Sequence, residues 1–185
     1  AAALTRAAHM QGDPVRATVR FSNGGGDPTT PDNSKDGRGL AVKLYLEDGT
    51  RTDLVALTLP RFFVRNAEDF LEFTRARKPD PETGRPDMAK IGAFLEAHPE
   101  ALPAIQHALS QPAPASYAQL EYHGIHAYKW IAPDGTERWI RFSFRPLAGV
   151  AGLSDEEAAE RPDDYLQEEL RDRLAREPVE FELEI

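Results

Sequence analysis

The chain has 185 residues and a formal net charge of -9, from 22 basic and 31 acidic side chains. This charge argues against a nucleic-acid partner or an anionic membrane surface, and no apolar run approaches the roughly 20 residues that a membrane-spanning helix needs. The chain has no cysteine, which excludes disulfides, thiolate catalysis and cysteine-ligated metal centres but leaves the compartment, cytoplasmic or periplasmic, open.

A single domain across residues 1–185 is the expected organisation, because this length suits one hydrophobic core and is short for two. The sequence starts at Ala1 without an initiator Met. It stops at residues 181–185, whose alternating polarity is typical of a strand. We therefore expect a piece of a longer protein, truncated at both ends.

The first sixty residues predict a series of antiparallel strands. Residues 4–10 suit the end of a helix that Gly and Pro interrupt. Residues 23–37 are rich in Gly, Pro, Asp and Asn and predict a loop, whereas residues 47–49 (Glu-Asp-Gly) predict a hairpin turn. Alternating polarity predicts strands at residues 16–21, 39–46 and 52–59.

The period of the apolar residues changes after Pro60. A helix is predicted to begin near Ala67, with Asn66 as its N-cap and acidic residues favouring its positive end. Residues 78–87 form a Pro-rich linker, and a second Pro-rich break covers residues 111–114. Between these breaks, short helices are predicted at residues 88–97 and 100–110.

The last third of the chain predicts a second hairpin and a helix. The hairpin strands are residues 117–131 and 137–144, with a Pro-Asp-Gly turn at residues 133–135. The helix covers residues 164–176 and presents three leucines on one face. Because hairpins dominate the order of elements, the predicted fold is α+β, an antiparallel β-barrel with inserted and flanking helices.

Histidines and a tyrosine are the candidate metal ligands. His123 and His126 stand three apart on a predicted strand and so face opposite sides, which makes a shared metal ion unfavourable. His98 and His107 lie in predicted helices as surface or packing residues. Tyr165, four residues after an arginine, has the side chain of a haem iron ligand, but its place on the apolar helix face favours packing.

Two arginines on predicted strands are stronger candidates for contacts with a carboxylate. Arg20 and Arg38 lie beside apolar residues, where an unpaired guanidinium would be costly. The partner of each is Asp36, Asp53 or the carboxylate of a bound group such as a haem propionate. Spacing alone favours a structural salt bridge. Taken alone, the four phenylalanines of residues 62–73 are equally compatible with an ordinary hydrophobic core.

Taken together, the motifs resemble the catalase superfamily, and especially the small catalase-related haem peroxidases. The resemblance covers almost the whole length, and the ordered set of motifs is more specific than any one of them. The motifs are Val-Arg-Phe-Ser at 19–22, Arg-Gly-Leu-Ala-Val-Lys at 38–43, Asp-Leu-Val at 53–55, Pro-Arg-Phe-Phe-Val-Arg at 60–65, Gly-Ile-His-Ala-Tyr-Lys at 124–129, and residues 165–184.

The resemblance implies a haem b pocket. In the family pattern, the position of Arg20 pairs with a haem propionate, and the positions of Gly39 and Val55 lie against the porphyrin. The remaining matches are aromatic contacts on the distal side, Phe62 and Phe70, and pocket-lining positions in the second hairpin, Gly124 and Ile125. His126 falls where the family has His or Asn and is not assigned a catalytic role.

Three departures from the family pattern shape the functional hypothesis. The distal His precedes the Val-Arg-Phe-Ser motif by more residues than this chain has, and the proximal Tyr that binds iron lies beyond Ile185. No catalytic residue or metal ligand is therefore assigned within the chain. In addition, Leu57 stands near the place where catalases carry the distal Asn, which favours peroxidase activity over rapid dismutation of peroxide.

The resemblance thus implies a haem-dependent peroxidase that reduces hydrogen peroxide or an organic peroxide with a small organic electron donor. This stretch alone is expected to be inactive, and homo-oligomerisation is left open. The alternative is a non-enzymatic β-barrel that binds haem or another apolar ligand. An interaction domain that uses the acidic helices has no support beyond charge.

Overall fold

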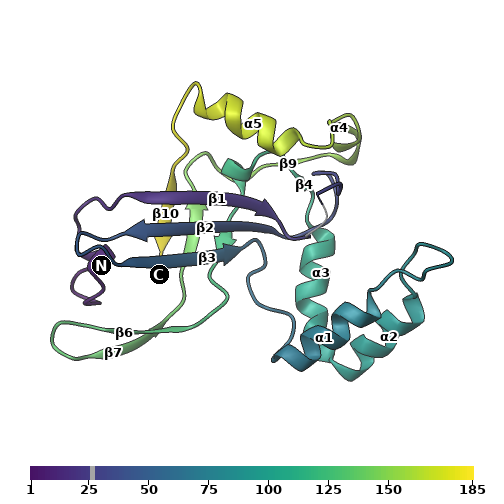
Figure 1. Ribbon diagram of the computed structural model, residues 1–185, viewed down its shortest axis with the longest axis horizontal. Coiled ribbons are helices and arrows are strands. Elements are labelled where there is room, and N and C mark those ends of the chain that lie inside the picture. Colours follow the sequence, from purple (N-terminus) through teal and green to yellow (C-terminus); the bar gives the residue numbers. More distant parts are fainter. Residues whose placement is uncertain (26–27) are drawn as a thin grey trace. The chain divides into compact units, whose positions relative to one another are not determined.

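The structure is a computed structural model that describes residues 1–25 and 28–185. The chain divides into two compact units, residues 1–60 with 111–185 and residues 61–110 (Figure 1). The loop predicted at residues 23–37 includes residues 26 and 27, which lie outside the described residues. Within the described part, no helix has the length and apolar character needed to cross a membrane.

A six-stranded antiparallel sheet forms the first unit. Its strands, in spatial order, are β1 (Ala17–Asn23), β2 (Arg38–Tyr45), β3 (Arg51–Leu57), β5 (Tyr122–His123), β8 (Ser143–Pro146) and β10 (Phe181–Glu184). The predicted α+β class is confirmed. The sheet is curled but open, because β1 and β10 are not paired with each other in the described residues, and so it forms a half-barrel rather than the predicted closed barrel.

The meander β1–β2–β3 follows the predicted strands closely. The turn between β2 and β3 is confirmed, with Gly49 at a φ of 84°. This left-handed conformation is strained for residues with a Cβ. The carboxylate of Asp48 accepts hydrogen bonds from the backbone nitrogen of Thr50 at 2.9 Å and from its hydroxyl at 2.6 Å. The turn therefore fixes the register of the two strands.

The predicted second hairpin is divided. Its tip is the hairpin β6 (Tyr128–Ile131) and β7 (Glu137–Ile140), turned at Gly135, which has a φ of 84°. Its base joins the main sheet through β5 and β8, and residues 124–127 between β5 and β6 are irregular. A further short ladder pairs β4 (Ala113–Pro114) with β9 (Gly152–Leu153).

Short helical segments complete the first unit. A 3₁₀ turn at Ala8–Met10 replaces the helix end predicted at residues 4–10, and another covers Tyr117–Gln119. The acidic stretch after β9 forms α4 (Asp155–Ala159), which begins with a capping box between Ser154 and Glu157. The predicted helix at residues 164–176 is confirmed as α5 (Tyr165–Leu174).

The second unit is helical, as predicted. It contains α1 (Ala67–Ala76), α2 (Met88–Ala97), a 3₁₀ turn at Pro99–Ala101 and α3 (Leu102–Ser110). Asn66 is the N-cap of α1, and its side-chain oxygen accepts a hydrogen bond from the Asp69 nitrogen at 2.8 Å. The core of this unit is a cluster of small and aromatic side chains: Val64, Ala76, Phe94 and Ala101.

One face of the main sheet carries the core of the first unit. Leu40, Ala56 and Tyr122 are at most 2% exposed and pack together with Phe144 of β8. Phe21 of β1 joins this face, and its ring stacks on Tyr117 with centroids 5.5 Å apart. Burying aromatic rings of this size is the main source of stability available to the sheet.

Arg38 is the buried charge at the start of β2. It is 2% exposed and donates hydrogen bonds to the carbonyl oxygens of Asp32 at 2.7 Å, Ser34 at 3.0 Å and Asp36 at 2.6 Å. The salt bridge predicted with Asp36 or Asp53 was therefore wrong for Arg38. Main-chain carbonyls of residues 32–36 accept from its two terminal nitrogens instead, whereas Nε is buried and, in the described part of the chain, has no hydrogen-bond partner.

Tyr117 is a fully buried, titratable side chain of the first unit. Burial, and secondarily the charge of Asp32, raises the pKa of Tyr117 to about 12. Its hydroxyl donates a hydrogen bond to Asn23 Oδ1 at 2.7 Å. Because an unfolded tyrosine ionises near pH ~10, this residue stabilises the fold below that pH, and the contribution is lost as the pH rises toward about 12.

We expect Tyr117→Phe to reduce the loss of unfolding free energy between pH 9 and pH 11, because the variant has no phenol to ionise at this position. Urea unfolding followed by circular dichroism at both pH values measures this loss. Tyr128→Phe, at an exposed ring of β6, is the matched control and should keep the wild-type loss. An unchanged loss in Tyr117→Phe would contradict the assignment.

Candidate functional site

The face of the meander opposite the core carries most of the predicted pocket residues. Residues opposite one another in a sheet point to the same side. Arg20, Ala41 and Val55 form one such row across β1, β2 and β3. The next row crosses all six strands and consists of Ser22, Gly39, Leu57, His123, Ser143 and Glu184. The structure thus brings Arg20, Gly39, Val55 and Leu57 together on one side of the sheet. We call this side the open face.

The open face is apolar at its centre and exposed. Val55 is 50% exposed although its neighbour Ala56, on the core side, is fully buried. An ideal Cβ on Gly39 would lie 2.8 Å from Ser22 Oγ and 3.8 Å from the Leu57 side chain. The absence of a side chain at Gly39 therefore leaves a low surface in the middle of the long row.

Arg20 is the cation of this face. It is exposed, and within the described residues no hydrogen bond or ion pair joins its guanidinium to another side chain. The salt bridge predicted with Asp53 is not formed, because the carboxylate of Asp53 pairs with Lys43 Nζ at 2.7 Å. Asp36 is also engaged, since its carboxylate accepts a hydrogen bond from the Gly25 nitrogen at 2.6 Å. The guanidinium is therefore available to an external anion.

Gly124 and Ile125 follow directly after His123, the member of the long row that lies on β5. The nitrogen of Gly124 donates to the Phe142 carbonyl oxygen at 2.8 Å, and an ideal Cβ on Gly124 would lie 2.8 Å from the Phe142 ring. Arg141 holds this segment, because its guanidinium donates to the carbonyl oxygens of Gly124 at 3.2 Å and Pro60 at 2.5 Å. Glycine is therefore required at position 124 for close packing.

A pocket of about 280 Å³ continues the long row beyond Leu57. It is lined by Pro60, His123, Arg141, Phe142 and Ser143 together with residues 184–185. Its polar groups and small volume are compatible with a small polar molecule rather than a macrocycle. The open face itself, not this pocket, offers the larger apolar area.

The predicted aromatic contacts lie in the second unit. Phe62 and Phe70 stack with centroids 5.9 Å apart, and they are 40% and 45% exposed. Phe63 lies between them and the core, with its ring 4.5 Å from that of Phe73. The two exposed rings thus form an apolar surface at the start of α1, while Phe63 and Phe73 are packing residues.

The remaining candidate ligands from the sequence lie apart from the open face or at its end. Tyr165 is 4% exposed, and its hydroxyl donates to the Pro114 carbonyl oxygen at 2.5 Å, so the packing interpretation is confirmed. His123 lies on β5 with its Nδ1 atom 3.9 Å from a carboxylate oxygen of Glu121. His126 lies in the irregular segment after β5, and its ring is 6.5 Å from that of Tyr128.

Two parts of this arrangement were not predicted from the sequence. Ala41 lies between Arg20 and Val55, and the two-residue period from Gly39 would have placed it on the open face. His98, interpreted as a surface or packing residue, belongs to a group of three candidate metal ligands with Asp69 and Glu100. His98 and Glu100 are two residues apart, but Asp69 lies on α1, so no local spacing signals the group of three.

Comparison with known sequences gives consistent matches. The family model described as Catalase matches residues 1–185. A catalase-related peroxidase from Mycolicibacterium paratuberculosis is 38% identical over 185 residues, covering 98% of this chain and 57% of that protein. A catalase-related peroxidase from Synechococcus elongatus is 34% identical over 178 residues, covering 96% of this chain and 52% of that protein. The chain thus spans about half the length of these relatives.

Solved structures agree. A bacterial catalase superposes with a TM-score of 0.81 and 27% identity, covering 92% of this chain and 34% of that one. A fungal catalase superposes with a TM-score of 0.78 and 32% identity, covering 88% of this chain and 33% of that one. The curled antiparallel sheet with helices is therefore a fold that this chain shares with much longer proteins.

Gly124 provides a test of the packing at the end of the open face. Gly124→Ala should lower the free energy of unfolding by about 1–3 kcal/mol, because the new methyl group would overlap the Phe142 ring. Gly92→Ala is the matched control, since nothing lies within 4 Å of an added Cβ there. It should stabilise α2 by about 0.5–1 kcal/mol. Urea unfolding followed by circular dichroism measures both, and equal effects would contradict the packing argument.

Proposed function

This chain belongs to the catalase family, and we propose that its open face is the haem-facing wall of a catalase-related peroxidase. The relatives that carry the name catalase-related peroxidase are 38% and 34% identical to it. Because the chain spans about half of their length, the activity, substrates and donor are proposed for the full-length protein. The observation that carries the proposal is Arg20, a cation that has no partner among the described side chains and lies beside an exposed apolar row.

The open face fits haem in three respects. Gly39 and Ala41 leave the surface low, which permits a flat macrocycle to approach the strands. Val55 exposes apolar surface that a porphyrin would cover, with a gain of about 25 cal/mol for each Å² buried. Arg20 supplies a guanidinium that no described side chain neutralises and that a propionate would pair with.

We assign the remaining wall positions in the same way. Leu57 lies on the long row and Gly124 and Ile125 follow its β5 member, His123; we propose Phe62 and Phe70 as aromatic contacts of the same cofactor. The cofactor proposed is haem b, with its iron ligand, a Tyr, and its distal His outside the residues present here. We further propose that the half-barrel is closed into a barrel in the full-length protein.

When bound, haem supplies the redox-active iron at which peroxide is reduced with electrons from a small organic donor. The residues of this chain bind and orient the cofactor and exclude water from one of its faces. Leu57 offers no hydrogen bond to peroxide, and this favours peroxidase activity over dismutation. The distal His and the iron-binding Tyr of the family pattern are not assigned to any residue of this chain, so we expect the chain alone to be inactive.

The full-length protein tests this function directly. We expect a Soret absorption band after haem reconstitution and peroxide-dependent oxidation of an organic dye. The 185-residue chain under the same conditions should oxidise no dye. A full-length protein that stays colourless after reconstitution would overturn the proposal and favour a barrel that binds a different apolar ligand.

Arg20→Ala in the full-length protein should weaken haem retention by about tenfold or more, because a charge-assisted hydrogen bond contributes roughly 1.5–3 kcal/mol. Transfer of haem to an excess of apomyoglobin measures the loss. Arg16→Ala is the matched control, since this exposed arginine lies over the Tyr45 ring, 5.0 Å from its centroid, outside the wall. Equal haem loss from the wild type and from Arg20→Ala would count against the propionate role.

A further inference from the structure

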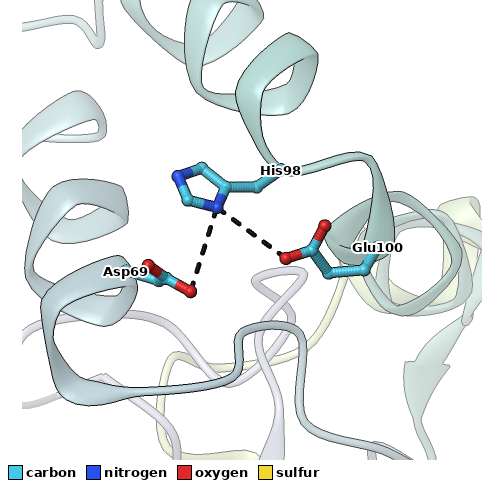
Figure 2. A group of neighbouring side chains, drawn as sticks. All are labelled: Asp69, His98 and Glu100. Carbon is cyan, nitrogen blue, oxygen red and sulfur yellow. Dashed lines mark ion pairs between the residues drawn. The ribbon is translucent and has the colours of Figure 1, made fainter.

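Three side chains from separate elements of the helical unit converge on one point (Figure 2). Asp69 lies in the first turn of α1, His98 follows the last residue of α2, and Glu100 lies in the 3₁₀ turn Pro99–Ala101. His98 Nδ1 is 3.9 Å from Asp69 Oδ2 and 3.8 Å from Glu100 Oε1. The side chains of Asp69 and His98 are only 18% and 14% exposed.

The orientation of the His98 ring is fixed on both sides. The ring stacks on Phe94 with centroids 4.5 Å apart. Its Nε2 atom is 3.2 Å from Glu72 Oε2, which as a carboxylate only accepts. We infer that Nε2 carries the hydrogen, so that in the neutral ring Nδ1 directs a lone pair at Asp69 and Glu100.

A cation suits this arrangement, because Nδ1 of His98 and the carboxylates of Asp69 and Glu100 face one another. A proton on Nδ1 would draw a carboxylate oxygen to about 2.7–2.9 Å. The distances of 3.9 Å and 3.8 Å are too long for that hydrogen bond. A tetrahedral ion with bonds of roughly 2.1 Å separates its ligands by about 3.4 Å, which the gap accommodates after a small contraction.

Glu100 provides a second observation. Its Oε2 atom is buried and, in the described part of the chain, has no hydrogen-bond partner. Its Oε1 atom accepts from Arg65 Nε at 2.7 Å and lies 2.6 Å from Arg65 Nη2, so the free lone pairs of this carboxylate are those of Oε2. Metal-bound histidines and carboxylates usually have such outer partners, and here Glu72 and Arg65 occupy these positions.

We propose that Asp69, His98 and Glu100 bind a divalent transition-metal ion of the Zn²⁺ class. One imidazole nitrogen and two carboxylate oxygens suit this class, whereas Mg²⁺ and Ca²⁺ prefer oxygen ligands throughout. The ion joins α1 to the turn between α2 and α3, and it stabilises the helical unit. This site shares no residue with the proposed haem wall, and the proposal does not depend on it.

The test is titration of the metal-free chain with ZnCl₂ by isothermal calorimetry, together with thermal unfolding. We expect one equivalent to bind and the unfolding temperature to rise with ZnCl₂ but not with MgCl₂. His98→Ala should weaken binding at least tenfold. His107→Ala, which removes a histidine from α3 of the same unit, should leave it unchanged.

Because His98→Ala also removes a ring packed on Phe94, Asp69→Asn serves as a second variant of nearly the same shape. It should also weaken Zn²⁺ binding at least tenfold. Zn²⁺ binding of wild-type strength in both variants would move the site elsewhere and overturn the proposal. So would a wild-type chain that binds no Zn²⁺, since the cluster would then be an ion-pair network only.

Discussion

The buried guanidinium of Arg38 is the constraint on which the first unit depends. A guanidinium that is 2% exposed needs hydrogen-bond acceptors, because burying a charge without them costs more free energy than a single packing contact provides. Its acceptors are carbonyl oxygens of residues 32–37, so this segment before β2 must wrap around it. Asp32 in this loop then accepts hydrogen bonds from Asn23 Nδ2 at 2.7 Å and from the Leu166 nitrogen at 2.8 Å. One charge therefore ties the end of β1, the start of β2 and the start of α5 together.

This constraint also separates the two faces of the sheet. Arg38 is paired with Asn23, and that register places Leu40 opposite Phe21 on the core side and Gly39 opposite Ser22 on the open face. A shift of one residue would exchange the two sets, because side chains alternate along a strand. The open face can therefore keep an exposed Val55 and an unpaired Arg20, which contribute little to stability, while the core face supplies the packing energy.

Patterns local in the sequence predicted much of the fold. Alternation identified β1, β2 and β3, and capping identified α1 at Asn66, because these signals act between residues a few positions apart. Features that depend on distant segments were not predictable in this way. The carbonyl acceptors of Arg38 come together only when residues 32–37 fold. The predicted second hairpin is divided because β5 and β8 pair within the main sheet, while β6 and β7, in the described residues, form a sheet of their own. On the candidate site, spacing identified residues that share a strand face, but it could not show that Asp53 is already paired with Lys43.

The helical unit shows the same dependence on contacts between distant segments. Asp69 and Glu72 lie three apart on α1 and so share a face, but nothing in their spacing indicates that the turn carrying His98 and Glu100 packs against that face. Phe70 is the next residue after Asp69, and its ring stacks on Phe62. An ion held by Asp69 would restrain the first turn of α1 and with it the exposed aromatic pair. The metal site and the aromatic surface are therefore coupled through one helical turn, although no side chain belongs to both.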